Sequence, residues 1–325
     1  MNLYPLKFKP IFKEKIWGGN KIKSILDLDY SPLPNCGELW ALSGIDENPS
    51  IVTNGFLEEN ELNELVEVYM GDLVGDKVFE KYGNEFPVLI KFIDAQQWLS
   101  VQVHPDDKLA KKRHQSLGKS EMWYVLQADE KAELISGFSK EMSEQKYLDA
   151  LSNKELKAIL NFEKVSKGDV YNIPAGRVHS LGPGIFIAEI QQTSDVTYRI
   201  YDWDRQDEKG NERELHTEEA LAAIDFSFQK NYKTDYHATD NISSELLNCE
   251  HFTTNMLSLT ETVEKDYFAL DSFVAYVCIE GAVNIAYSEG KEKIVAGETI
   301  LIPAELKELT LIPEPTGKLL EVYIK

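Results

Sequence analysis

Four side chains between residues 102 and 179 could share one metal ion. Gln102 and His104 are two residues apart in a segment where aliphatic and polar residues alternate, which predicts that both lie on one face of a β-strand. Glu121 begins an apolar segment, and His179 follows a turn rich in glycine and proline. These nitrogen and oxygen donors, without sulfur, suit Zn²⁺, Fe²⁺ or Mn²⁺ and leave coordination positions for water or substrate.

The elements that must position these residues are mainly strands. Residues 87–107 and 249–325 read as strands separated by turns, and helical segments are predicted near 58–82 and 141–163. The three cysteines are widely spaced and odd in number, so we expect buried free thiols in place of a disulfide framework or a thiolate metal site.

The sequence also contains an internal repeat. The segment from Gly168 to His179 matches the segment from Gly297 to Glu308: each has a glycine, five residues, Pro-Ala and then a strand. Gly176 and His179 of the first copy are replaced by glutamates in the second. Repetition of a β-rich unit predicts two similar barrels. We therefore expect the chemistry in residues 1–235 and a degenerate barrel without a metal site in residues 236–325.

The pattern Gly-x5-Pro-x-Gly-x2-His from Gly168 to His179 resembles the second cupin motif, in which the glycines and Pro174 shape a turn that projects the histidine into the barrel mouth. One conventional motif residue is absent, since Pro183 stands where the pattern has asparagine. The predicted fold class is mainly β, with double cupin (jelly-roll) barrels and a small helical insertion.

Several segments, in order, resemble type I phosphomannose isomerases. They are IWGG at 16–19, CGELW at 36–40, PVLIKFIDAQQWLSVQVHPDD at 87–107, GKSEMWYV at 118–125, GDVYNIPAGRVHSLG at 168–182 and AEIQQTSDVTYRIYDWDR at 188–205. The resemblance implies one zinc ion per chain held by Gln102, His104, Glu121 and His179, with Gln102 alternatively a hydrogen-bonding partner of a ligand. It further implies active-site roles for Arg199 and Lys119, and phosphate contacts from Ser100 and Lys91.

The implied reaction is the interconversion of mannose 6-phosphate and fructose 6-phosphate through an enediol. Zinc, Arg199 and Lys119 would stabilise the developing oxyanion. The group that transfers the proton stays open between a zinc-bound water, a carboxylate such as the substrate-site candidate Glu189, and a lysine with a lowered pKa. Two other functions fit a histidine–carboxylate site: a non-haem iron cupin oxygenase, which leaves Gln102, Lys119 and Arg199 unexplained, and a non-catalytic sugar-binding cupin.

Composition limits the partners. The formal net charge of −21 disfavours nucleic acid and anionic membranes, and no segment is apolar for long enough to span a bilayer or to act as a signal peptide. An anionic substrate therefore requires local positive charge, for which Lys91, Lys119 and Arg199 are the candidates. We expect a cytoplasmic monomer or homodimer that takes a phosphorylated hexose. The sequence leaves the exact hexose phosphate and the metal used in the cell undecided.

Overall fold

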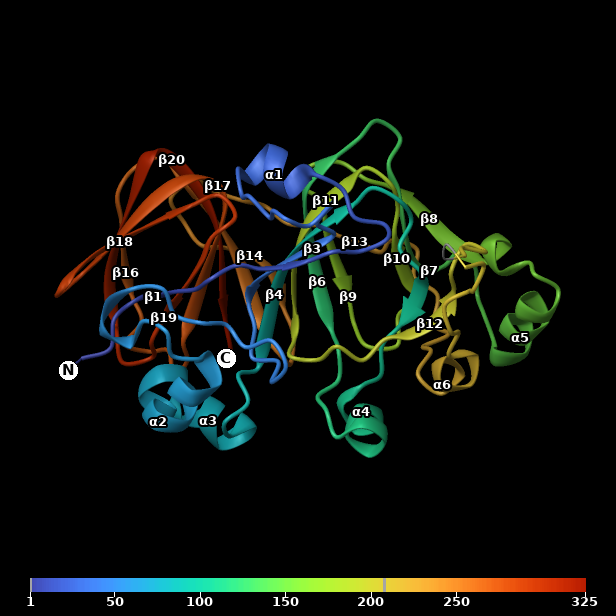
Figure 1. Ribbon diagram of the computed structural model, residues 1–325, viewed down its shortest axis with the longest axis horizontal. Coiled ribbons are helices and arrows are strands. Elements are labelled where there is room, and N and C mark those ends of the chain that lie inside the picture. The colour runs from blue at the N-terminus through green and yellow to red at the C-terminus, as the bar shows by residue number, and fades with distance from the viewer. Residues whose placement is uncertain (1, 207–208) are drawn as a thin grey trace.

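The computed structural model describes residues 2–206 and 209–325, and its secondary structure is mainly β. Two β-rich units lie side by side along the longest axis of the molecule (Figure 1). We call them the N-terminal unit, which contains strands β2 to β13, and the C-terminal unit, which contains β14 to β20 together with β1. No helix in the described ranges is long and apolar enough to cross a membrane.

The N-terminal unit consists of two antiparallel sheets. The seven-stranded sheet has the order β13 (Lys233–Thr234), β9 (Val170–Ile173), β6 (Glu121–Ala128), β11 (Ile185–Gln192), β4 (Val88–Ala95), β3 (Glu38–Leu42) and β2 (Ile11–Lys13). The five-stranded sheet has the order β12 (Tyr198–Tyr201), β5 (Val101–Val103), β10 (His179–Leu181), β7 (Glu133–Phe138) and β8 (Leu160–Lys164). Polar residues that lie between these sheets can therefore face one another.

The alternation predicted for residues 99–104 holds from residue 100 onward, but Leu99, expected on the outer face with Val101 and Val103, instead lines the cavity between the sheets. Val101 and Val103 pack with helices α5 (Glu144–Ser152) and α6 (Thr217–Leu221) in one apolar cluster, on the opposite face of the strand from Gln102. Burying each such aliphatic side chain stabilises the fold by about 1.5–3 kcal/mol. Apolar packing on the outer face thus fixes the strand so that its polar residues point toward the other sheet.

The C-terminal unit is one eight-stranded antiparallel sheet. Its strands are β1 (Leu6–Lys7), β14 (Ser244–Asn248), β15 (Thr253–Leu259), β16 (Val263–Asp266), β17 (Val274–Tyr287), β18 (Gly290–Val295), β19 (Thr299–Ile302) and β20 (Glu308–Tyr323). Because β1 pairs with β19, the beginning of the chain belongs to this sheet. Figure 1 shows β1 beside the C-terminal strands.

The two units share an apolar core. Phe92, Tyr124 and Ile190 from the N-terminal unit pack in one cluster with Val277 and Leu320 from the C-terminal unit. Helices α2 (Leu62–Val74) and α3 (Asp76–Tyr82) also contact the C-terminal unit, since the Val74 carbonyl accepts a hydrogen bond from the Phe273 amide at 3.1 Å. The C-terminal unit is thus packed firmly against the unit that holds the candidate ligands.

The helix predictions were right in part. Helices α2 and α3 fall within residues 58–82, whereas the region 141–163 is helical only in α5 and in a 3₁₀ turn at Leu156–Ala158. The prediction of a helix was wrong for residues 160–163, which lie in β8, a strand that pairs with β7. Helices α1 (Lys21–Leu26) and α4 (Asp107–His114), and a 3₁₀ turn at Gly55–Leu57, were not foreseen. Pairing with a strand that is distant in sequence overrode local propensity at β8.

The internal repeat has a structural counterpart. Gly168 and Gly297 have φ angles of +91° and +95°, a region that residues with a Cβ rarely adopt, and each begins a turn into the next strand. Those strands are β9, which pairs with β6, and β19, which pairs with β17. The two glycines therefore mark equivalent turns in the two units.

Candidate metal centre and its cavity

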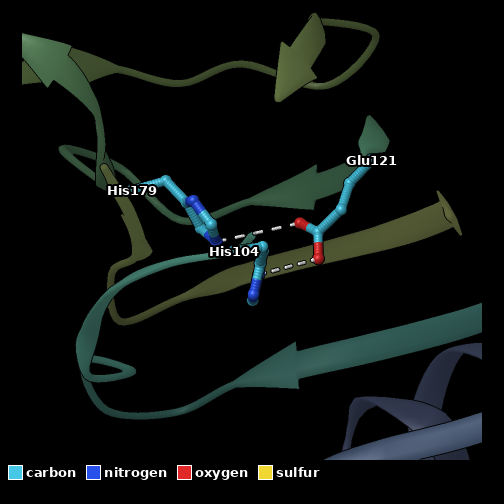
Figure 2. Close-up of side chains that lie close together, drawn as sticks. All are labelled: His104, Glu121 and His179. Atoms are coloured by element: carbon cyan, nitrogen blue, oxygen red, sulfur yellow. Dashed lines mark ion pairs between the residues drawn. The ribbon is translucent and has the colours of Figure 1, made fainter. Parts of the chain in front are cut away.

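Three buried donors meet between the sheets of the N-terminal unit (Figure 2). The ligating atoms of His104, Glu121 and His179 all lie within 4.8 Å of one another. The Nε2 atom of His104 is 3.1 Å from Glu121 Oε1, and the Nε2 atom of His179 is 3.8 Å from Glu121 Oε2. Since zinc binds such atoms at about 2.0–2.2 Å, donors spaced in this way can surround one ion.

The orientation of both imidazoles is fixed by backbone carbonyls. His104 Nδ1 donates to the Val196 carbonyl at 2.9 Å, and His179 Nδ1 donates to the Arg177 carbonyl at 2.8 Å. A carbonyl can only accept, so each Nδ1 carries the proton and each Nε2 presents a lone pair. The buried Nε2 of His104 has no hydrogen-bond partner among the described atoms. An unsatisfied lone pair beside a carboxylate fits a metal ion.

Gln102 lies beside this group. It is opposite His179 in the pairing of β5 with β10, and its Nε2 atom is 3.3 Å from His179 Nε2. The oxygen and nitrogen of an amide are assigned from their surroundings, and turning the amide over would aim its oxygen at the same point. The structure therefore brings all four predicted ligands together, with Gln102 at the edge of the group.

The buried environment sets the charge of the donors. Burial, reinforced by the positive charge of Lys119, lowers the pKa of His104 to about 3, and burial also lowers the pKa of His179. Burial opposes ionisation of Glu121, but the charge of Lys119 holds its pKa well below the usual range. At neutral pH the site thus offers two neutral imidazoles and one carboxylate, the protonation states that bind a metal.

A cavity of about 310 Å³ adjoins this group. It is lined by Lys15, Trp17, Glu38, Lys91, Ile93, Leu99, Ser100, Gln102, Lys119, Glu121, Trp123, Leu181, Glu189, Asp195, Thr197, Arg199 and Arg213. A larger groove of about 870 Å³ lies on the C-terminal unit, but the metal-capable group found in the described part of the chain adjoins the smaller cavity. The smaller cavity is therefore the candidate active site.

Three ammonium groups of the cavity each lie close to a carboxylate. The pairs are Lys15–Glu38 at 3.1 Å, Lys91–Glu189 at 3.6 Å and Lys119–Glu121 at 3.1 Å. Burial opposes ionisation of Glu38, yet the charges of Lys91 and Lys15 lower its pKa to about 2. Lys91 also lies 5.1 Å from the centre of the Trp40 ring, so its charge is held by neighbours on two sides.

Glu189 differs from the other carboxylates of the cavity. Burial, and then the negative charge of Glu121, raise its pKa to about 7. The indole Nε1 of Trp123 donates to Glu189 at 2.8 Å and to Glu121 at 3.1 Å, so one side chain bridges the two acids. A carboxylate that titrates near neutral pH can gain and lose a proton during a reaction.

Arg199 reaches the cavity from β12. It lies opposite Gln102 in the pairing of β12 with β5, and its Nη1 atom donates to the Glu214 carbonyl at 2.7 Å. Its Nε atom has no hydrogen-bond partner among the described atoms. Ser100, which precedes β5, is buried in the wall of the same cavity. Lys91, Lys119, Glu189, Arg199 and Ser100 thus gather around one space.

Sequence reasoning assigned no role in the site to five polar residues of the cavity: Lys15, Glu38, Asp195, Thr197 and Arg213. Lys15 lies far from the ligands in the chain, and Arg213 lies in a charged segment without a periodic pattern. Asp195 and Thr197 lie in the segment 188–205 that resembles the family, whereas the requirement for local positive charge pointed to Lys91, Lys119 and Arg199 and not to Lys15 or Arg213.

Comparisons with known proteins agree on one family. Residues 5–167 match the family model described as phosphomannose isomerase type I, catalytic domain. The chain is 34% identical over 318 residues to mannose-6-phosphate isomerase ManA of Bacillus subtilis, covering 96% of each protein. A crystal structure of mannose 6-phosphate isomerase from Bacillus subtilis superposes with a TM-score of 0.88 at 30% identity, over 98% of this chain and 99% of the other. A zinc-bound mannose 6-phosphate isomerase structure, 16% identical, has the same fold with a TM-score of 0.77 over 99% of each chain.

Proposed function

This chain belongs to the type I phosphomannose isomerase family, and from that premise we propose that it is a zinc-dependent isomerase interconverting mannose 6-phosphate and fructose 6-phosphate. The observation that carries the proposal is the convergence of His104, Glu121 and His179 beside a cavity lined with lysine and arginine. The lining has five lysine and arginine side chains beside four carboxylates, so in a protein with a net charge of −21 this cavity still offers local positive charge to an anionic substrate.

Gln102, His104, Glu121 and His179 would hold the zinc ion. Support comes from the Nε2 lone pairs of the two histidines, which lie beside the Glu121 carboxylate, from the unsatisfied Nε2 of His104 and from the zinc-bound relative. When bound, zinc supplies Lewis acidity that polarises the oxygens of the sugar. We propose one ion per chain.

The remaining polar groups are proposed to act on the sugar. Isomerisation moves a proton from carbon 2 to carbon 1 of the aldose, and negative charge develops on an oxygen as the enediol forms. Arg199 and Lys119 would stabilise that charge. Burial opposes protonation of Lys119, but the neighbouring carboxylates of Glu121 and Glu189 hold its pKa above the usual range, so this lysine is a cation and a poor base. Glu189, whose pKa burial raises above its usual value, is better suited to move the proton.

Ser100 and Lys91 are proposed to contribute to substrate binding. Both lie in the wall of the cavity and are buried. Lys91 is already paired with Glu189, so removing it would change the charge of Glu189 as well as any contact with substrate. Its role is therefore expected to combine binding with control of the neighbouring acid.

We propose that the two units are cupin (jelly-roll) barrels, with a catalytic barrel in residues 1–235 and a degenerate barrel without a metal site in residues 236–325. The equivalent glycine turns at Gly168 and Gly297 support this division. The expected setting is the cytoplasm, with a phosphorylated hexose as substrate and a monomer or homodimer as the assembly.

A coupled assay of mannose 6-phosphate isomerisation, with and without a chelator, tests the function. Turnover should disappear on chelation and return with zinc. Oxygen consumption by the iron-loaded protein would favour an oxygenase, and saturable sugar binding without turnover would favour a binding protein. Full turnover in a metal-free preparation would overturn the proposed role of zinc.

A further inference from the structure

Two arginines, Arg213 and Arg205, lie beside the buried carboxylate of Asp202, and a third, Arg199, is close enough to feel the charge of that carboxylate. Arg213 Nε donates to Asp202 Oδ2 at 2.7 Å and Arg213 Nη2 donates to Asp202 Oδ1 at 2.5 Å. Arg205 Nη1 is 3.9 Å from the same carboxylate. Burial lowers the pKa of Arg199, and the positive charge of Arg213 lowers it further, so these two guanidinium groups are electrostatic neighbours. Asp202 and the exposed Glu214 are the carboxylates that act on Arg199 among the described residues.

Two of these arginines differ in what they face. Arg213 lines the cavity and keeps 34% of its side chain exposed, whereas Arg205 does not line it and donates to the Trp98 carbonyl at 2.5 Å. Asp202 occupies one edge of the Arg213 guanidinium, formed by Nε and Nη2. A guanidinium has five N–H donors, so Arg213 keeps donors for another anion while Asp202 fixes its orientation.

The strand pairing orders these groups along the cavity. Arg199 lies opposite Gln102, beside the metal group, and Tyr201 lies opposite Val101. Ser100 precedes Val101, and Asp202 follows Tyr201. Ser100 and Asp202, the residue that orients Arg213, therefore lie at the same end of the two strands. Arg199 lies between this end and the metal group.

We propose that Arg213, oriented by Asp202 and assisted by Ser100, anchors the phosphate of a sugar phosphate monoester, and so selects phosphorylated over unphosphorylated sugars. The proposal rests on the proposed function and deepens it. A hexose 6-phosphate has its reacting carbons at one end and its phosphate at the other, which matches the order of metal group, Arg199 and Arg213. Arg199 then acts on the sugar and Arg213 on the remote phosphate.

The other cations of the cavity are less suited to this role. Lys91 and Lys119 keep only 4% and 6% of their side chains exposed and are each paired with a buried carboxylate, whereas phosphate is strongly hydrated and favours an open position. Lys15 is as exposed as Arg213, at 35%, but its ammonium is a point charge paired with Glu38 and lacks the fixed planar set of donors that a guanidinium offers to phosphate. Lys15 is therefore the informative competitor.

The test compares Arg213→Ala with Arg205→Ala and Lys15→Ala in the zinc-loaded full chain. Calorimetric titration with fructose 6-phosphate and with fructose measures the phosphate contribution, steady-state assays give KM and kcat, and inorganic phosphate serves as a competing inhibitor. Arg213→Ala should weaken fructose 6-phosphate binding and inhibition by phosphate about 10- to 100-fold and raise KM more than it lowers kcat. Arg213→Lys should recover only part of the loss.

Arg205→Ala should bind fructose 6-phosphate within about twofold of the wild type, and fructose binding should be unchanged in every variant. The proposal is overturned if Arg213→Ala binds fructose 6-phosphate normally, or if Arg205→Ala loses as much affinity for it as Arg213→Ala does. It is also overturned if Lys15→Ala, and not Arg213→Ala, loses the preference for fructose 6-phosphate over fructose. A wild type that binds fructose 6-phosphate through Arg213 but does not turn over mannose 6-phosphate would leave the subsite standing and remove only the proposed function.

Discussion

The N-terminal and C-terminal units share a strand arrangement but place different side chains on its inner face. Glu121 lies opposite Ile173 in β6 and β9, and Val274 lies opposite Ile302 in β17 and β19. Both isoleucines stand five residues after a glycine with positive φ. Val274, which is buried in the C-terminal core, therefore occupies the position of the carboxylate donor.

The position of His179 shows why sequence alignment alone misleads. The repeat in the sequence aligns His179 with Glu308, but Glu308 is exposed and Leu309 is buried in the core. His179 lies opposite Gln102, and Leu309 lies opposite Lys265. A shift of one residue exchanges the two faces of a strand. Leu309 thus takes the inward position, and Lys265 takes the place of Gln102.

Each unit keeps one buried glutamate at the same place. Glu189 lies opposite Trp123 in the N-terminal unit, and Glu321 lies opposite Tyr276 in the C-terminal unit. In the C-terminal unit the Lys265 ammonium lies 2.6 Å from Glu321. Glu189 also has a lysine partner, Lys91 at 3.6 Å, but in the N-terminal unit His104, Glu121 and His179 gather in addition as donors that suit an external cation. The comparison supports the proposal that the chemistry lies in the N-terminal unit and that the polar core of the C-terminal unit is structural.

The largest expected effect is the loss of a metal donor. His104→Ala or His179→Ala should lose metal and activity together, because three donors already define the minimum site. Tyr267→Phe is the matched control. Lys265 takes the place of Gln102 in the C-terminal unit, so Tyr267, two residues later, takes the place of His104. Elemental analysis measures the metal content of the histidine variants and of the control, and the coupled assay measures their activity. Normal activity in either histidine variant would contradict the assignment.

Arg199→Ala should lower kcat about 10²–10³-fold, or about 3–4 kcal/mol, because a charged donor aimed at developing negative charge is lost. KM should change little and zinc content should stay normal, since the contribution arises in the transition state and Arg199 is not a ligand. Arg199→Lys should rescue poorly. If steady-state kinetics show a steep rise in KM at unchanged kcat, Arg199 is a phosphate anchor and its catalytic role is wrong.

Lys265→Met should reduce the free energy of unfolding by about 3 kcal/mol, because it leaves Glu321 buried without its cation. Metal content should not change. Lys293→Met is the control, because its pair with Glu314 is exposed to solvent and should contribute little to stability. Denaturant unfolding measures both, and equal losses would show that the buried pair has no special role.

The stability from this pair should depend on pH in a defined direction. Burial opposes ionisation of Glu321, but the charge of Lys265 and several hydrogen bonds lower its pKa. A lowered pKa in the folded state gives stability that is present above the unfolded value of about 4.3 and is lost as the pH falls through the folded value. The difference in the free energy of unfolding between the wild type and Lys265→Met should therefore be largest near neutral pH and should decrease in acid.

The smallest expected effect is that of restoring the motif in the second repeat. The double change Glu305→Gly and Glu308→His should still give one metal per chain by elemental analysis, because position 308 faces solvent and Leu309 and Val274 fill the inward positions. Two stoichiometric metals, in this variant or in the wild type, would contradict the difference between the units.

Much of the candidate site was determined by local patterns. Alternation placed Gln102 and His104 on one strand face, and the glycine turn before His179 specified where that side chain emerges. These features depend on the backbone geometry of a few neighbouring residues, which sequence alone specifies.

Only the tertiary structure decided the rest. Residues 160–163 became a strand because β7 offered a partner, and Lys15 and Arg213 joined the cavity from segments remote from the ligands. The inward position of Leu309 likewise depends on how β20 pairs with β16. Such outcomes are set by contacts between distant segments, whose burial and pairing energies exceed the local preferences that a sequence pattern reports.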